Sequence, residues 1–142
     1  MRGRRVGHAV AVPPPYDAHN FLNLLGIDVP PPDEDYDPVA RLTVTHPLIA
    51  GTGFLWAPVV ITMADALCAF GVSHHWPEGA KSFTTVNCSS QFISSAREGE
   101  EVRATASPLH LGRTTQVWDA TVTNETTERL MASYRCTQLI LY

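Results

Sequence analysis

The residue of this chain best placed to do chemistry is a single carboxylate, Asp65. Its neighbours Met63, Ala64 and Leu67 are apolar, and a carboxylate buried among apolar side chains without partners is costly. A position facing a ligand is therefore attractive, and there the carboxylate would serve as a nucleophile or as a general base. The alternative is a structural aspartate whose charge is satisfied by a neighbouring hydroxyl, such as that of Thr62.

The cysteines and histidines do not form a metal-binding or disulfide pattern. Cys68, Cys88 and Cys136 are odd in number and far apart, so we expect three buried, reduced thiols. His74-His75 has no third ligand nearby, and adjacent side chains rarely converge on one ion. We therefore predict no metal site.

Asp65 lies in a helix predicted over residues 56–71. Pro58 suits the first helical turn, and Gly71 suits the position just past the last one. Alanines between the large apolar residues leave little polar surface, so we expect protein to enclose this helix on all sides. The apolar residues that recur at helical spacing are Val59, Val60, Met63, Leu67 and Phe70.

Five stretches alternate apolar and polar residues in the manner of strands, at 39–49, 82–93, 100–109, 113–124 and 129–142. In the second of them, strict alternation places Thr85 on the opposite face from Cys88. Short connections at 94–99, 110–112 and 125–128 indicate that strands adjacent in sequence pair antiparallel. We predict an α+β fold in which an antiparallel β-sheet wraps around a long central α-helix.

Length and charge limit the other possibilities. A chain of 142 residues with 44% hydrophobic content fits one globular domain. We expect residues 1–15 to be a disordered leader and 16–142 a single domain, with a short helix at 16–25 and a surface linker at 29–38. The formal charge of −4 argues against binding nucleic acid or a membrane. Without a signal sequence or a long apolar run, the expected location is cytoplasmic.

The order of elements and several short motifs resemble the hot-dog fold, and specifically the PaaI-type acyl-CoA thioesterases, over roughly residues 39–141. In that family an Asn, a spacer and His-Gly-Gly lead into the helix, which carries the acid of a Leu-Ala-Asp/Glu triplet. Met63-Ala64-Asp65 matches the triplet, and Gly53 matches a spacer glycine. Other matching segments are Phe83 to Asn87, Phe92 to Gly99, Leu111-Gly112-Arg113 and Leu130 to Ser133.

The chain departs from the family pattern at the start of the helix. Ala50 stands in place of the Asn, and Trp56-Ala57-Pro58 in place of His-Gly-Gly. The backbone N–H of Ala57 still occupies the position of the first motif glycine, at the positive end of the helix. Its alternative is a plain helix start packed by Trp56.

The resemblance implies hydrolysis of an acyl-CoA or acyl-carrier thioester, with Asp65 as general base or nucleophile and the Ala57 N–H polarising the carbonyl. Thr85 matches a family Ser/Thr that positions water or substrate, although a plain cross-strand threonine is the alternative. Arg97 and Arg113 lie in turns where such enzymes hold the phosphates of coenzyme A, or are simply solvated. No cofactor is expected beyond coenzyme A as part of the substrate.

The acyl group would need a pocket, and Trp56 and Phe54 could line one that is apolar or aromatic. In a core of this size the same two side chains could equally be packing. The sequence does not decide between these roles.

Ala57 and Asp65 are eight residues apart, which is about 12 Å along a helix. They can act on one carbonyl only if two helices run side by side in opposite directions. We therefore expect an obligate two-fold dimer with two interfacial sites, which could pair again into a tetramer.

Two other functions fit the same fold. The missing Asn and His-Gly-Gly motifs favour a non-catalytic protein that binds acyl-CoA or an acyl carrier. A hot-dog hydratase or dehydratase would need a histidine near the helix start, and His46 is the nearest imidazole in sequence.

Overall fold

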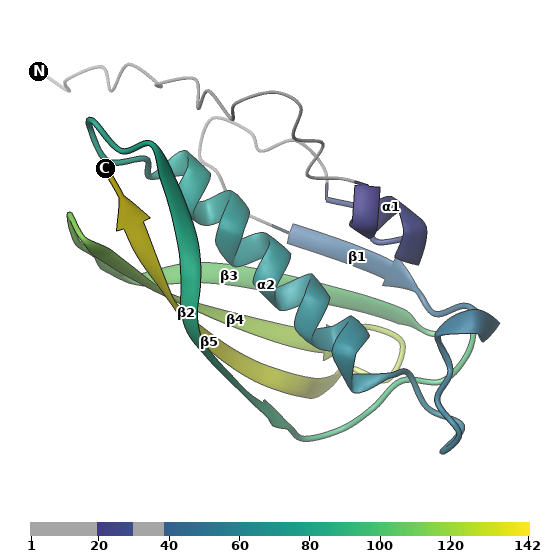
Figure 1. Cartoon of the computed structure of the whole chain (residues 1–142). Coiled ribbons are helices and arrows are strands. Elements are labelled where there is room, and N and C mark those ends of the chain that lie inside the picture. The colour runs from purple at the N-terminus through teal and green to yellow at the C-terminus, as the bar shows by residue number, and fades with distance from the viewer. Residues whose placement is uncertain (1–19, 30–38) are drawn as a thin grey trace, which may run out of the picture.

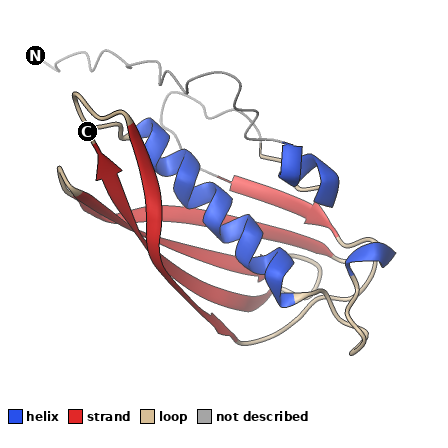
Figure 2. Cartoon of the chain, viewed as in Figure 1, coloured by secondary structure: helices blue, strands red, loops and turns tan. Residues whose placement is uncertain are grey.

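A computed structural model of the chain describes residues 20–29 and 39–142. The predicted leader and nearly all of the predicted linker lie outside the described residues. The elements, in order, are α1 (Asn20–Leu25), β1 (Val39–Thr43), the 3-10 helix η1 (His46–Leu48), α2 (Ala57–His74), β2 (Ser82–Phe92), β3 (Glu101–Leu111), β4 (Thr115–Asn124) and β5 (Arg129–Leu141). The five strands form one antiparallel sheet that curls around α2, so the predicted α+β architecture is confirmed (Figures 1 and 2).

The sheet order is β1-β3-β4-β5-β2. The β3–β4 and β4–β5 hairpins agree with the prediction, but the predicted pairing of β2 with β3 is wrong, because β2 pairs with β5 at the far edge. The connection from β2 to β3 passes the start of α2, where the Leu55 N–H donates to the Ala96 carbonyl at 2.9 Å. A connection of this length spans up to about 27 Å, more than the roughly 15 Å across three strand spacings. A short connection therefore did not require a hairpin.

The first strand is shorter than predicted. β1 ends at Thr43, and residues His46–Leu48 form η1 instead of continuing the strand. Pro47 lies in the first turn of η1, where its missing N–H costs nothing and its fixed φ suits a helical turn. The same proline would have cost a ladder hydrogen bond inside the sheet.

Gly71 is an interior residue of α2 and not its stop, because the helix continues to His74. A Cβ at Gly71 would lie 2.5 Å from two ring atoms of Trp118. Trp118 is fully buried on β4, and its indole N–H donates to Gln116 Oε1 at 2.9 Å. The glycine therefore allows α2 to pack closely on β4, at a cost in intrinsic helix propensity.

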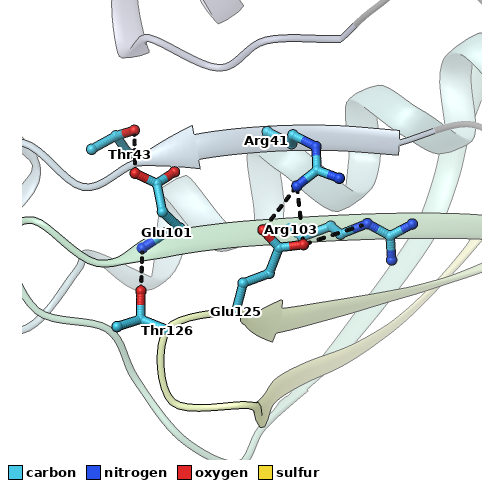
Figure 3. A network of polar contacts seen from close by, with 6 residues as sticks. All are labelled: Arg41, Thr43, Glu101, Arg103, Glu125 and Thr126. Atoms are coloured by element: carbon cyan, nitrogen blue, oxygen red, sulfur yellow. Dashed lines mark hydrogen bonds and ion pairs between the residues drawn. The ribbon is translucent and has the colours of Figure 1, made fainter.

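The outer face of the sheet is polar. The carboxylate of Glu125 accepts from Arg41 at 2.8 Å and lies 3.7 Å from Arg103 Nε, as Figure 3 shows. Glu101 accepts from the Thr43 hydroxyl at 2.7 Å on the same face. Exposed ion pairs add little stability, but they indicate that this face meets solvent and that the core lies between the sheet and α2.

Among the described helices, α2 is the one long and apolar enough to cross a membrane by length and composition. It packs against β3, β4 and β5, and its large apolar side chains Met63 and Leu67 are fully buried. It therefore serves as the core helix of the fold.

Replacing Gly71 by alanine should destabilise the protein. Overpacking in a core costs about 1–3 kcal/mol and occasionally more. A Cβ 2.5 Å from the ring of the fully buried Trp118 belongs at the upper end of that range, above the roughly 1 kcal/mol that alanine gains over glycine inside a helix. Urea unfolding of Gly71→Ala should show a lower free energy of unfolding. Gly51→Ala is the control, because a Cβ there meets nothing within 4 Å; equal stability of both variants would contradict the packing role.

Candidate active site

Asp65 is hydrogen-bonded by a tyrosine that approaches from the sheet. The hydroxyl of Tyr134, on β5, donates to Asp65 Oδ1 at 2.7 Å. The tyrosine residue is 2% exposed, whereas the aspartate is partly exposed. The Thr62 hydroxyl does not reach Asp65, because it donates to the Pro58 carbonyl at 2.8 Å. Within the described part of the chain no second group hydrogen-bonds the carboxylate, so Oδ2 is free.

Burial and the neighbouring Asp65 carboxylate raise the pKa of Tyr134. Both effects disfavour the phenolate, the first by desolvation and the second by charge and by accepting the hydroxyl proton. Tyr134 therefore remains a hydrogen-bond donor at neutral pH. The sequence analysis gave Tyr134 no role; the available signal was that a buried tyrosine hydroxyl needs an acceptor.

Asp65 lies on a stripe of α2 that the protein's own sheet does not cover. Pro58, Thr62, Asp65 and Ala69 recur at helical spacing, and all four are partly or fully exposed. The prediction that protein encloses this helix on every side is therefore wrong for this stripe within the single chain. The edge strand β2 is likewise exposed along nearly its whole length.

A bulge in β2 changes which way Thr85 points. In the pairing with β5, Thr85 is opposite Gln138 and Cys88 is opposite Cys136, with a register shift between Thr85 and Asn87. The extra residue reverses the alternation, so Thr85 shares the inner face with Cys88, contrary to strict alternation. Its hydroxyl donates to Gln138 Oε1 at 2.9 Å, and not to Asp65.

The three cysteines are free, but only Cys68 and Cys136 are buried. The expectation of a buried thiol is wrong for Cys88, which is exposed on the edge strand β2, because α2, the long helix among the described elements, packs mainly on β3, β4 and β5. A hydrogen bond with Cys136, together with burial, raises the pKa of Cys68, which keeps that thiol protonated. Among the described residues, no group of three or more His, Cys, Asp or Glu side chains could hold a metal ion.

Several predicted site residues gather at the start of α2. Ala57 is the first helical residue and is exposed, and no acceptor in the described residues binds its N–H. Trp56 is 49% exposed beside it. The Arg97 guanidinium lies 4.7 Å from the centre of the Phe54 ring. The start of α2 therefore presents a free backbone donor, two aromatic rings and a cation.

Arg113 lies at the opposite end of α2. Its guanidinium is 5.3 Å from the centre of the Tyr142 ring, and the two residues line a groove with His75 and Glu78, beyond the last turn of the helix. Figure 1 shows the β3–β4 turn at the far end of the molecule from the start of α2. Within one chain the structure does not bring Arg97 and Arg113 together.

His46 forms an exposed pair with Glu98. The Nδ1 to Oε2 distance is 3.2 Å, and the histidine side chain is 82% exposed. An imidazole in open solvent is not held against a substrate, so this arrangement does not favour a hydratase.

A five-stranded antiparallel sheet curled around one long helix, with an acid on that helix, defines the hot-dog class. The PaaI protein of Escherichia coli has the same fold, with a TM-score of 0.74 and 24% identity over 86% of this chain and 84% of that chain. Residues 52–131 match the family model described as the thioesterase superfamily. The chain belongs to this superfamily, and the predictions of a hot-dog fold like that of PaaI and of a thioester hydrolase are confirmed.

Curated relatives support the same family. ComA2 of Bacillus subtilis is 27% identical over 123 residues, which cover 87% of this chain and 95% of that protein. The 1,4-dihydroxy-2-naphthoyl-CoA hydrolase of Listeria monocytogenes is 30% identical over 99 residues, which cover 70% of this chain and 78% of that protein.

The loop that carries Arg97 is held by Glu100. The Arg97 backbone N–H and the Asn124 side-chain amide each donate to Glu100 Oε2 at 2.7 Å. Both bonds lower the pKa of Glu100 below its ordinary value, and the bond from the Arg97 N–H has the larger effect. They do so because they stabilise the charged form of the carboxyl group.

This shift predicts a pH-dependent effect of Glu100→Gln. The unfolded chain lacks both bonds, so the stabilisation is complete above the ordinary pKa of 4.5 and is lost as pH falls through the lower folded-state pKa. In urea unfolding, wild type should therefore have a higher free energy of unfolding than Glu100→Gln. This difference should be largest at neutral pH and should shrink in acid. A difference that does not change with pH would contradict the assignment.

Proposed function

We propose that the protein hydrolyses an acyl-CoA thioester at a site shared between two copies of the chain. The observation that carries the proposal is that α2 has both a free carboxylate oxygen, on Asp65, and a free backbone N–H, at Ala57, and that both residues are at least partly exposed. The relative from Listeria monocytogenes is named as a hydrolase of an aromatic acyl-CoA, which supports this substrate class.

Two chains are needed because the two groups are too far apart on one helix. Eight residues of helix separate Ala57 from Asp65 by about 12 Å. A second α2, running antiparallel along the open stripe, would bring its own Ala57 close to Asp65. Two-fold symmetry then creates two equal sites.

The edge strand β2 supports such a dimer. It is 11 residues long, and the sequence Ser82–Phe92 contains no charged residue and no proline, the features by which edge strands usually avoid pairing. Val86 and Phe92 on this strand are 55% and 48% exposed. Antiparallel pairing of two β2 edges would extend the sheet and cover both strands.

In the proposed reaction, Asp65 of one chain either attacks the thioester carbonyl or removes a proton from an attacking water. The N–H of Ala57 from the other chain, at the positive end of its helix, stabilises the oxygen on which negative charge develops. In the general-base route water adds to the carbonyl, the carbon–sulfur bond breaks, the proton taken up by Asp65 passes to the thiolate of coenzyme A, and the acyl group leaves as a carboxylic acid. In the nucleophilic route the carbon–sulfur bond breaks to leave an anhydride between the acyl group and Asp65, and a water molecule then hydrolyses it, which releases the acid and restores the carboxylate. Thr85, on the inner face of β2, assists in orienting water or substrate.

Binding of the substrate is assigned to the start of α2. Arg97 offers a forked cation to the phosphates of coenzyme A, and Phe54 and Trp56 offer apolar surface for the acyl group. Arg113, at the other end of the helix, would have to contact a different part of the coenzyme. We place the reaction in the cytoplasm, where free thiols such as that of Cys88 remain reduced.

A non-catalytic acyl-CoA-binding protein is the second candidate. Pro58 has no N–H, and the N–H of Val59 donates to the Trp56 carbonyl. The start of the helix therefore offers a single free donor, at Ala57. One donor can bind the carbonyl oxygen of a thioester, but it stabilises an oxyanion less than several donors would.

The test of the proposed function is release of free thiol from a panel of short-chain, long-chain and aromatic acyl-CoAs. We expect release from at least one substrate and a fall in kcat of about 100-fold or more for Asp65→Asn, since general-base catalysis contributes about 10²–10⁴. The control is Asp119→Asn, whose carboxylate pairs with Arg135 on the outer face of the sheet. Binding without release would favour the second candidate, and full activity of Asp65→Asn would remove this acid from the mechanism.

The shared site can be tested by mixing two inactive variants. Ala57→Pro removes one N–H at a helical position that accepts proline, and Asp65→Asn removes the acid. After unfolding and refolding together, a mixed dimer has one doubly altered site and one intact site, so we expect recovery of about a quarter of the wild-type activity. If both groups act within one chain, mixing restores nothing.

A further inference from the structure

We infer that Tyr134 is a positioning residue, which fixes the Asp65 carboxylate through Oδ1 and leaves Oδ2 as the oxygen that meets water or the thioester. This inference rests on the proposed function of Asp65. It starts from the 2.7 Å hydrogen bond between the two side chains.

The tyrosine is anchored well enough to define the position of the acid. Tyr134 lies in the middle of β5, paired with Ala120 of β4 on one side and Ser90 of β2 on the other. The residue is 2% exposed, so packing holds its ring. A reacting group is best placed by a partner that is itself locked by packing, because small errors of position are costly in rate.

The aspartate needs such a partner more than a buried residue would. Asp65 is partly exposed on the open stripe of α2, where its short side chain could adopt more than one rotamer. Within the described part of the chain, Tyr134 is the one group that hydrogen-bonds it. The bond therefore selects the orientation of the carboxylate before a substrate or a second chain arrives.

The bond does more than satisfy the aspartate. A partly exposed carboxylate can be hydrated, so Asp65 does not require a protein donor in order to be stable. The buried hydroxyl of Tyr134, in contrast, requires an acceptor, and a phenylalanine would fill the same space without that requirement. The hydroxyl thus adds a constraint on Asp65 that packing alone does not demand.

The test is Tyr134→Phe, which keeps the ring and removes the hydroxyl. We expect kcat on the best acyl-CoA to fall by about 10- to 100-fold, in the range seen when a reacting group is misplaced by about 1 Å, with KM changed less than about twofold because Tyr134 binds no substrate. The matched control is Thr43→Val, which removes a hydroxyl that also donates to a carboxylate at 2.7 Å, that of Glu101 on the outer face of the sheet, and should leave kcat unchanged.

A second readout does not depend on activity. The Tyr134 hydroxyl is buried and donates to Asp65 Oδ1, so NMR of ring-labelled tyrosine at neutral pH should show the Tyr134 signal shifted in Asp65→Asn. The loss of one signal in Tyr134→Phe assigns it. An unchanged Tyr134 signal in Asp65→Asn would overturn the inference.

The two proposals fail in different ways. If the wild type releases thiol and Asp65→Asn does not, yet Tyr134→Phe retains full kcat, the positioning role is wrong and the proposed function stands. If a fall in kcat comes with an equal loss of folded protein in thermal unfolding, the hydroxyl is structural and the positioning role is also overturned. If the wild type releases no thiol from any acyl-CoA, the proposed function fails and the role of Tyr134 fails with it.

Discussion

The packing of α2 is the constraint on which the rest of this structure depends. The helix is apolar over most of its surface, so every part of it left in water costs free energy, roughly 25 cal/mol for each Å² of apolar area. Its own sheet covers the faces that meet β3, β4 and β5. The remaining stripe, with Pro58, Thr62, Asp65 and Ala69, stays partly open in the single chain.

That uncovered stripe also carries Asp65, the acid of the proposed site. Asp65 can contact water there because it is partly exposed, and Tyr134 can reach it because β5 packs against the helix. The same exposure leaves the inner face of β2 open, with Thr85 and Cys88 on it. A second chain that covers the stripe would enclose these residues, so covering the helix and completing the site would be one event.

The sequence predicted the architecture well because apolar periodicity and turn lengths are local. It placed the long helix, all five strands and the acid at Asp65. It failed where a tertiary contact decided the outcome. Gly71 reads as a helix stop, yet it lies inside the helix because Trp118 leaves no room for a Cβ. The length of the connection after β2 sets how far the chain can travel before β3, but not in which direction. It could therefore not show that β2 pairs with β5 instead of β3.

The site was only partly predictable for the same reason. Asp65 and the free N–H of Ala57 follow from residue types and from the start of the helix. The orientation of Thr85 depends on a bulge that shifts the register between Thr85 and Asn87, and alternation cannot show an extra residue. The bond from Tyr134 joins residues that are 69 positions apart. The alternation of residues along a strand does not show which point along α2 a side chain of β5 will meet.

Because Trp56-Ala57-Pro58 replaces the His-Gly-Gly motif, the placement of the Asp65 carboxylate matters more for the proposed reaction. Of the first three residues of α2, Pro58 has no N–H, and the N–H of Val59 donates to the Trp56 carbonyl at 3.0 Å. Under the proposed function, one backbone donor, at Ala57, is left to stabilise developing charge. A removed donor of this kind typically costs about 10²–10³ in rate. Under the proposed function, a site with one donor depends more heavily on the placement of its carboxylate, and the buried hydroxyl of Tyr134 is the group that fixes it.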